Sequence, residues 1–517
     1  MTRSGLGHLT VGSLPTIAAT RFADQEAFFC TATGRRSTFG QVNERCNRLA
    51  NALTALGLKK GDCVAFLSTN RTEVVEIYFA LAKAGLVGMP VNYRLAPVEM
   101  LALLRDVDAA ALLYERKYAH VAELVGAELP TLRARVGFGD GAGPGHDYET
   151  LLAAADGAEP NQEVHEHDPY YYNLTSGTTG MPKCYVISHY NNAATLSMAQ
   201  ALEMSRDDVV LTAFPMYGRV GFCWMAFSVM YGVRNVLMNF DADQALELIG
   251  SERITVTNLV PTMGAMMLNS PVLPRARLES LRAVVFAGSL LPASVREGVM
   301  SRICPRLWEY YGMQETGTLV VSTPQDRAKR ADSVGRPILF TEVRVVDDEG
   351  RDVPRGETGA VIGRGPTTVV AYHHNPQKTA ETFRDGWLHT GDLGRIDEEG
   401  YLFINGRLKD MIVTGGQNVH AGEVESALLD FPDVADCAVI ALPDPLWGEA
   451  VTAVVVPVAG AAVDPRVLVA HCRQTLAGFK VPKHVLVQDE PLPRTPTGKV
   501  QKFLLEQRYD PSKKQET

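Results

Sequence analysis

The sequence predicts an α/β protein, in which a large N-terminal domain of doubly wound sheets and a small β-barrel-like subdomain precede a small α+β C-terminal domain. The chain of 517 residues is longer than one hydrophobic core usually organises. Helix and strand signals alternate through residues 39–95, which is typical of a parallel sheet. Short β-like pieces follow at 334–403, and a compact mixture of both signals ends the chain.

The first alternating stretch contains a polar–apolar helix at 41–57, a buried strand at 63–68, a second helix at 71–85 and a second strand at 87–92. Helices between strands at this spacing favour crossover connections in a doubly wound sheet. The same alternation of helix and strand signals recurs at 242–256 and at 281–288, where the strand RAVVFAG ends in glycine. We therefore expect one large α/β region that extends to about residue 400.

The pattern changes at residues 334–403. EVRVVDD, TGAVIGRG and GYLFING are separated by acidic and glycine-containing turns, which favours antiparallel strands or a small barrel. After Arg407 the strands ADCAVIAL and AVTAVVVP accompany helices at 422–429 and 465–476. We place the domain boundary near Lys409, which gives domains 1–408 and 409–517.

Composition excludes several classes of protein. With 46% hydrophobic and 21% charged residues the chain is globular, and its net charge of −9 provides no basic field for nucleic acid. The eight cysteines are scattered singly, which indicates a reducing compartment. Neither a signal-peptide core nor an apolar run of membrane-span length occurs, so we expect a cytoplasmic protein without a membrane span.

The segment YYYNLTSGTTGMPK carries the clearest chemical signal. Its glycines let backbone N–H groups converge on an anion, its hydroxyls add donors, and Lys183 adds a positive charge. It is not a Walker A loop, because Pro182 stands where that motif needs glycine and Cys184 where it needs Ser or Thr. We predict a phosphate-binding loop formed by Thr175, Ser176, Gly177, Thr178, Thr179, Gly180 and Lys183.

This loop and three later segments resemble the adenylate-forming superfamily, which contains acyl-CoA synthetases and other AMP-dependent ligases, luciferases and peptide-synthetase adenylation domains. The later segments are EYYGMQETG at 309–317, the run from 386 to 425 that contains HTGDLG and NGRLKD, and PRTPTGKVQK at 493–502. They occur in the family's order. With GLKKGD and GLVGMPVN near the start, the resemblance covers essentially the whole chain.

The resemblance implies roles for individual residues. Asp392 and Arg407 would hold the ribose, and Glu315 would help to hold Mg²⁺ on the phosphates of ATP. Lys499 would stabilise charge while a carboxylate attacks the α-phosphate, so Lys499 and Glu315 are the predicted catalytic residues. Besides the loop, Asp392 and Arg407, the predicted nucleotide-binding residues are Gly288, Ser289, Tyr311, Gly312 and Gln314.

The resemblance also implies a two-step reaction with ATP, Mg²⁺ and coenzyme A. A carboxylic acid first becomes an acyl-AMP, and a thiol, most often that of coenzyme A, then displaces AMP. Between the steps a mobile C-terminal domain would swivel about Lys409, and Gly415 and Gly416 would then line the coenzyme A channel.

Four departures from the family pattern fall near these sites. Cys184 replaces a glycine, Gln314 replaces a threonine, Gly218 replaces the histidine that follows the aromatic Tyr217, and the glycine-pair segment reads GGQNVHA. Three hypotheses therefore remain open. The leading one is a complete acyl-CoA ligase, and the second is an enzyme that only thioesterifies acyl-AMP supplied by a separate adenylating enzyme. The third is an acyl-AMP ligase that loads a carrier protein.

The predicted acyl pocket favours a bulky or cyclic apolar acid. Small residues would widen it between larger side chains, and its predicted residues are Tyr217, Gly218, Arg219, Phe222, Met263 and Ala287. An α-amino acid is disfavoured, because Phe214 and Pro215 stand where amino-acid-activating relatives carry an aspartate. Arg219 either meets a polar group of the substrate or faces solvent.

Overall fold

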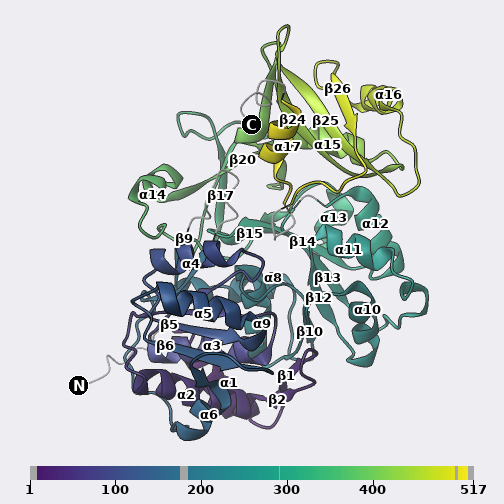
Figure 1. Ribbon diagram of the computed structural model, residues 1–517. Coiled ribbons are helices and arrows are strands. Elements are labelled where there is room, and N and C mark those ends of the chain that lie inside the picture. The colour runs from purple at the N-terminus through teal and green to yellow at the C-terminus, as the bar shows by residue number, and fades with distance from the viewer. Residues whose placement is uncertain (1–8, 175–183, 290, 495–498, 511–517) are drawn as a thin grey trace.

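The computed structural model describes residues 9–174, 184–289, 291–494 and 499–510. The larger, N-terminal part contains two sheets flanked by helices, and an antiparallel sheet connects it to a smaller part that contains the C-terminus (Figure 1). The protein is thus a mixed α/β protein with a large N-terminal sheet domain and a smaller C-terminal domain, as the sequence predicts. None of the described helices combines the length and apolar character needed to cross a lipid bilayer.

One sheet has seven strands in the order β7-β6-β5-β3-β4-β8-β9. All neighbours are parallel except the final pair, β8 and β9. The strands are β3 (Cys63–Leu67), β4 (Val87–Pro90), β5 (Ala111–Glu115), β6 (Ala134–Phe138), β7 (His146–Asp147), β8 (Pro169–Leu174) and β9 (Cys184–Ser188). The helices nearby in the chain are α1 (Ser13–Phe22), α2 (Phe39–Ala55), α3 (Thr72–Ala84), α4 (Pro97–Asp106), α5 (Ala119–Glu128), α6 (Tyr148–Ala154), α7 (His189–Ala193) and α8 (Leu196–Ala201), with the 3-10 turn η1 (Arg116–Tyr118).

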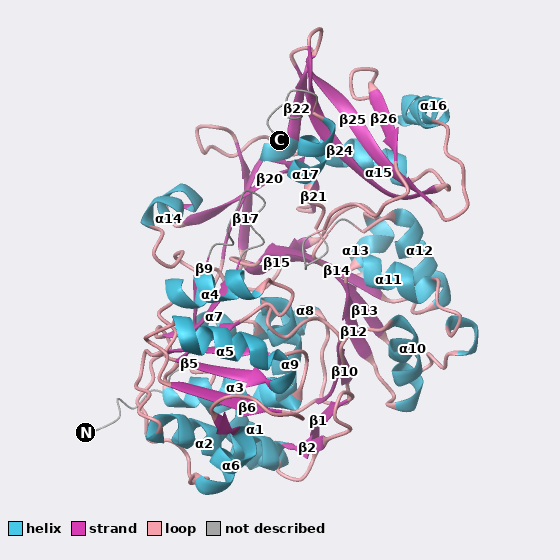
Figure 2. Ribbon diagram, viewed as in Figure 1, coloured by secondary structure: helices cyan, strands magenta, loops and turns pink. Residues whose placement is uncertain are grey.

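The second sheet has nine strands in the order β16-β15-β14-β13-β12-β10-β11-β1-β2. The strands are β1 (Glu26–Cys30), β2 (Arg36–Thr38), β10 (Val209–Thr212), β11 (Arg234–Leu237), β12 (Val256–Leu259), β13 (Ala283–Phe286), β14 (Leu307–Met313), β15 (Gly317–Ser322) and β16 (Arg336–Pro337). Its helices are α9 (Arg219–Tyr231), α10 (Ala242–Ser251), α11 (Pro261–Leu268), α12 (Ala293–Arg302) and α13 (Pro324–Lys329), with η2 (Leu273–Arg275). The helices and strands of this half lie in separate layers (Figure 2).

The region predicted to be antiparallel or barrel-like is a five-stranded antiparallel sheet. It contains β17 (Glu342–Val346), β18 (Gly359–Arg364), β19 (Phe383–Arg384), β20 (Trp387–Ile396) and β21 (Leu402–Arg407), with α14 (Pro376–Thr382). The short turn η3 (Leu408–Asp410) then leads into the C-terminal sheet. That part comprises β22 (Met411–Thr414), β23 (Gln417–His420), α15 (Ala421–Leu429), β24 (Val434–Asp444), β25 (Gly448–Pro457), α16 (Pro465–Thr475), β26 (His484–Val487) and α17 (Lys502–Tyr509).

Local chemistry explains where the first predicted helices begin and end. Helix α2 starts two residues before the predicted 41–57, because Thr38 caps it and Gln41 returns a hydrogen bond to the Thr38 backbone. Every residue of α3 is buried, and the helix stops at Gly85, whose φ of 66° is left-handed. A helix buried on all sides lies between layers, which is what a doubly wound architecture requires.

Candidate active site

A carboxylate and a guanidinium lie side by side where β20 pairs with β21. Asp392 is directly opposite Arg407 in this antiparallel pair, and Arg407 Nε is 3.2 Å from Asp392 Oδ1. The hydroxyl of Tyr311, at the end of β14, donates to Asp392 Oδ2 at 2.7 Å. Burial raises the pKa of Tyr311, so this hydroxyl remains a donor. The structure thus brings together three residues that the sequence assigned to nucleotide binding.

The motif YYGMQETG folds into a tight hairpin between β14 and β15. A Cβ on Gly312 would lie 1.9 Å from the carbonyl oxygen of Gly317, so the two arms approach too closely for any other residue. The hairpin presents Gln314 and Glu315 at its tip.

Two tyrosines hold the side chains of this loop. Tyr185 Oη donates to Gln314 Oε1 at 3.0 Å, and Tyr372 Oη donates to Glu315 Oε1 at 2.8 Å. Tyr185 and Tyr372 are themselves joined by an antiparallel backbone bridge. Neither tyrosine could be assigned to the site from the sequence, because the family motifs contain no signal for these long-range contacts.

Lys499 directly precedes Val500, whose backbone forms an antiparallel bridge with Arg494. Burial and the neighbouring Arg407 lower the pKa of Lys499, whereas the carboxylates of Asp392 and Glu315 raise it, and the net pKa is about 8. These interactions place the ammonium group within electrostatic reach of both carboxylates. The C-terminal part thus contributes a cation to a site built mainly by the N-terminal part.

The remaining nucleotide-site predictions lie at strand ends. Gly288 follows β13 with a φ of 94°, and it is exposed together with Ser289. A Cβ on Gly288 would be 3.3 Å from Val260 Cγ1, so both conformation and space favour glycine. Parallel strands end here at the edge where α/β proteins bind ligands.

The predicted phosphate loop, residues 175–183, lies outside the described residues. Its flanks are described, because Leu174 on β8 pairs with Cys184 on β9. Cys184 is buried in an extended strand, a conformation that any side chain can adopt. Cysteine in place of the family's glycine therefore causes no backbone strain at this position.

Several predicted acyl-pocket residues lie near the start of α9 and the end of β13. Gly218 is the N-cap of α9, and a Cβ there would be 3.6 Å from the Pro215 carbonyl, an ordinary contact. The Tyr217 ring packs edge-on against Tyr93 at 5.3 Å between centroids. Met263 is partly buried on α11, and Ala287 directly follows β13 and is buried.

Two other predicted pocket residues make different contacts. The Arg219 side chain is only 3% exposed, and its guanidinium donates to the carbonyl oxygens of Gln314 at 2.6 Å and Thr367 at 2.5 Å. It therefore does not face solvent. Phe222 packs against Tyr78 and Tyr171 in the aromatic core, with ring centroids 4.7 and 5.4 Å away.

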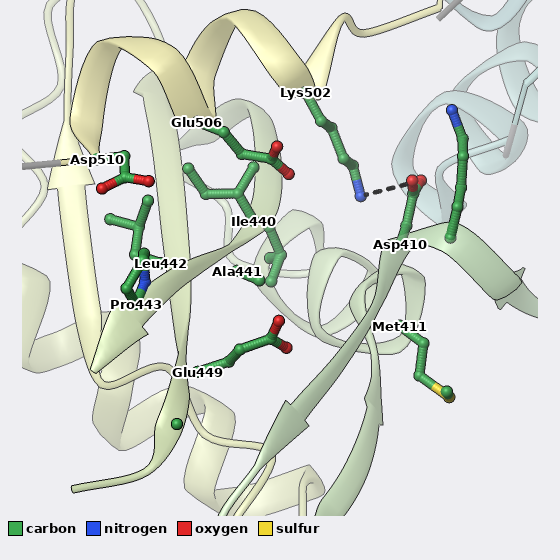
Figure 3. Close-up of a pocket in the computed structure, with 13 residues that line it drawn as sticks. Asp410, Met411, Ile440, Ala441, Leu442, Pro443, Glu449, Lys502, Glu506 and Asp510 are labelled. Atoms are coloured by element: carbon green, nitrogen blue, oxygen red, sulfur yellow. Dashed lines mark ion pairs between the residues drawn. The ribbon is translucent and has the colours of Figure 1, made fainter. Parts of the chain in front are cut away.

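The expected hinge coincides with η3, where Lys409 is exposed. Beside it lies an open cavity of about 440 Å³, walled by η3, β24, β25 and α17 (Figure 3). Lys502 extends from α17 toward Asp410, at 3.8 Å, and forms a shorter ion pair of 2.6 Å with Glu425. Lys502 therefore links the last described helix to Asp410 in η3 and to Glu425 on α15.

The predicted glycine pair forms the turn between β22 and β23. Gly415 and Gly416 have φ angles of 56° and 75°, the combination that two-residue hairpin turns require. Gly415 N–H donates to the Trp447 carbonyl at 2.7 Å, and a Cβ on Gly415 would be 2.9 Å from the Trp447 ring. That ring is 39% exposed, and Lys483 Nζ lies 4.8 Å from its centroid.

Two sheets flanked by helices, an antiparallel sheet that carries Asp392, and a C-terminal lysine that interacts electrostatically with Asp392 and Glu315 place the protein among the adenylate-forming enzymes. The family of AMP-binding enzymes matches residues 16–373, and the C-terminal domain of AMP-binding enzymes matches residues 423–499. The chain therefore belongs to this family, and it is an AMP-forming acyl-CoA ligase.

The relatives are named for different carboxylic acid substrates. The chain is 35% identical to a feruloyl-CoA synthase of an Amycolatopsis species, over 92% of this chain and 94% of the relative. It is also 35% identical to the long-chain-fatty-acid–CoA ligase FadD13 of Mycobacterium tuberculosis, over 94% and 95%. Among solved structures, ATP-bound MatB from Rhodopseudomonas palustris matches with a TM-score of 0.89 and 30% identity, over 98% of this chain and all of that one.

Proposed function

We propose that the protein performs both half-reactions on a bulky or cyclic carboxylic acid: it forms the acyl-AMP from ATP and then the coenzyme A thioester. The position of Lys499 carries this proposal. Its ammonium group is within electrostatic reach of Asp392 and Glu315. A chain that had lost adenylation would have no need to hold this cation beside the nucleotide residues.

In the first half-reaction, an oxygen of the substrate carboxylate attacks the α-phosphorus of ATP, and the bond to the bridging oxygen breaks to release pyrophosphate. Lys499 would stabilise the charge that develops between the two reactants. Asp392 would accept hydrogen bonds from the ribose hydroxyls, with its orientation fixed by Tyr311 and Arg407.

Glu315 fits the proposed magnesium role. Tyr372 occupies Oε1, and no described residue hydrogen-bonds to Oε2. Among the described residues no cluster of three metal-binding side chains exists, which suits Mg²⁺ because it binds through one or two carboxylates and substrate phosphates. When bound, Mg²⁺ would neutralise phosphate charge.

In the second half-reaction, the thiol of coenzyme A loses its proton, its sulfur attacks the acyl carbon, and AMP leaves. Gly415 and Gly416 have no side chains and would fit a narrow channel to the acyl group. We propose Lys409 as the hinge about which these glycines would turn toward the acyl-AMP. The neighbouring exposed Trp447 ring and Lys483 suit an adenine and its phosphates. The eight free, buried cysteines support a reducing, cytoplasmic location.

The acid is proposed from the pocket, because the relatives include both aromatic and fatty acids. Gly218 and Ala287 would contribute almost no side-chain volume to the proposed acyl pocket, and Tyr217 and Met263 would supply aromatic and thioether walls. Such a pocket would favour a ring over an acetate-sized group.

The test offers a panel of cyclic, aromatic, short and long-chain acids in two forms, as free acid with Mg-ATP and as presynthesised acyl-AMP. Each is combined with coenzyme A or with a phosphopantetheinylated carrier protein, and products are detected by mass spectrometry. Acyl-CoA from both forms supports the proposal. Acyl-CoA from the adenylate alone would contradict it in favour of a thioesterification-only enzyme, and product on the carrier protein alone would identify a carrier-loading ligase.

A further inference from the structure

We propose that Tyr185 is a positioning residue for adenylation: its hydroxyl orients the Gln314 amide so that the amide N–H groups face the α-phosphate. The inference rests on the proposed function and extends it to a residue outside the family motifs. Gln314 stands where the family has threonine, and the structure pairs it with a tyrosine that lies 129 positions earlier.

The direction of the hydrogen bond supports this role. Tyr185 Oη donates to Gln314 Oε1, which uses the acceptor end of the amide. No described residue accepts a hydrogen bond from Gln314 Nε2, so both amide donors are available to a ligand. A phosphate oxygen accepts hydrogen bonds from such N–H groups, whereas the negatively polarised Oε1 atom would repel it.

The backbone of the same loop is fixed independently of Tyr185. Arg219 donates to the Gln314 carbonyl at 2.6 Å, and Val369 N–H donates to the Glu315 carbonyl at 2.8 Å. Thr367 Oγ1 donates to the Thr316 carbonyl at 2.7 Å. Because every loop carbonyl from 314 to 316 has a donor, loss of the Tyr185 hydroxyl would free the Gln314 side chain and leave the loop in place.

Tyr185 itself has little freedom. It is fully buried on β9, and its backbone bridges Tyr372, whose hydroxyl holds Glu315. Burial keeps the phenol protonated by raising its pKa well above the ordinary value. A rigid, protonated donor can fix an amide in one of its two orientations.

The test is a double-mutant cycle of Tyr185→Phe and Gln314→Thr, measured separately in the two half-reactions. Tyr185→Phe is expected to lower kcat/KM for pyrophosphate release about tenfold, the size of one well-placed hydrogen bond. Thioester formation from presynthesised acyl-AMP should change less than about twofold. In the Gln314→Thr background, Tyr185→Phe should have almost no further effect on pyrophosphate release.

Tyr170→Phe is the matched control. Tyr170 is also fully buried, and its hydroxyl donates to the Tyr78 carbonyl at 3.0 Å, away from the loop. Equal losses in both half-reactions, or an equal loss in the Gln314→Thr background, would overturn the inference and show a structural role. Failure of the proposed function is distinct, because the wild-type enzyme itself would then release no pyrophosphate, whether or not it converts acyl-AMP. The inference fails when wild type releases pyrophosphate and the variants respond in either of the two ways just named.

Discussion

The ammonium group of Lys499, from the C-terminal part, interacts electrostatically with Arg407, Asp392 and Glu315 of the N-terminal part. Burial and Arg407 disfavour its charged form, whereas Asp392 and Glu315 favour it, and its pKa settles at about 8. A lysine with this pKa loses its charge within the range of ordinary assays. Because the lysine acts as a cation in the proposed mechanism, the first half-reaction should report its titration.

We therefore expect the rate of pyrophosphate release to fall as pH rises through about 8. The sign follows from the lowered pKa: Lys499 is charged below this value and neutral above it. Lys499→Arg keeps its charge to much higher pH, so this falling limb should move upward. Lys499→Ala should lower pyrophosphate release roughly 10²- to 10³-fold. A pH profile unchanged by Lys499→Arg would contradict this assignment.

At the residue scale, the sequence predicted which side chains belong to the site but not which residues they contact. Asp392, Arg407 and Tyr311 were predicted from motifs, and the structure places them in contact. Arg219 was assigned to the acyl pocket or to solvent, yet its hydrogen bonds go to backbone carbonyls 95 and 148 positions away. Such contacts depend on tertiary packing, which local patterns do not encode.

At the element scale, the hairpin of β14 and β15 sets the position of Gln314 and Glu315. Its arms are so close that a Cβ on Gly312 would meet the Gly317 carbonyl at 1.9 Å. Backbone atoms cannot move aside as a flexible side chain can. A small substitution at Gly312 should therefore disturb the hairpin.

Gly312→Ala is expected to lower the free energy of unfolding by about 1–3 kcal/mol and to reduce adenylation, because the arms must separate. Gly478→Ala is a suitable control, since a Cβ there meets nothing within 4 Å. It should change stability by less than about 0.5 kcal/mol. Chemical denaturation of both variants, with pyrophosphate release, measures the difference. Equal stability of the two variants would show that the hairpin can widen.

Alternating signals identified most elements near their true limits. The strands predicted at 63–68 and 87–92 are β3 and β4, and the helix predicted at 465–476 is α16. The order of strands within the sheets could not be predicted, because pairing of β1 with β11 joins segments far apart in the sequence. Residues 334–403 were expected to form antiparallel strands or a small barrel, and the observed antiparallel sheet agrees with the first alternative.

At the scale of the whole molecule, the proposed reaction cycle needs a C-terminal part that would supply Lys499 in one step and the glycine pair in another. Both features belong to the sequence after η3, so a rotation there would exchange them. The ion pair of Lys502 with Asp410 connects α17 to η3. Rotation about η3 is the motion that the proposed cycle requires.

Lys409→Pro should therefore slow thioester formation at least about tenfold while sparing pyrophosphate release, because proline fixes φ and restricts the preceding residue. Lys409→Ala removes the same side chain without this restriction and should affect neither step strongly. Single-turnover assays of each half-reaction separate the outcomes. Equal losses in both steps would place the hinge elsewhere.

The exposed indole ring of Trp447, beside Gly415, is an intrinsic fluorescent probe. Of the four tryptophans, Trp224 and Trp308 are buried and should emit almost constantly. Trp447 contacts Gly415 and stacks near Lys483, so its fluorescence should change when this surface turns from solvent toward the acyl-adenylate. Stopped-flow emission of the unlabelled wild-type enzyme could then time the switch between its two chemical steps, with Trp447→Phe as the silent reference.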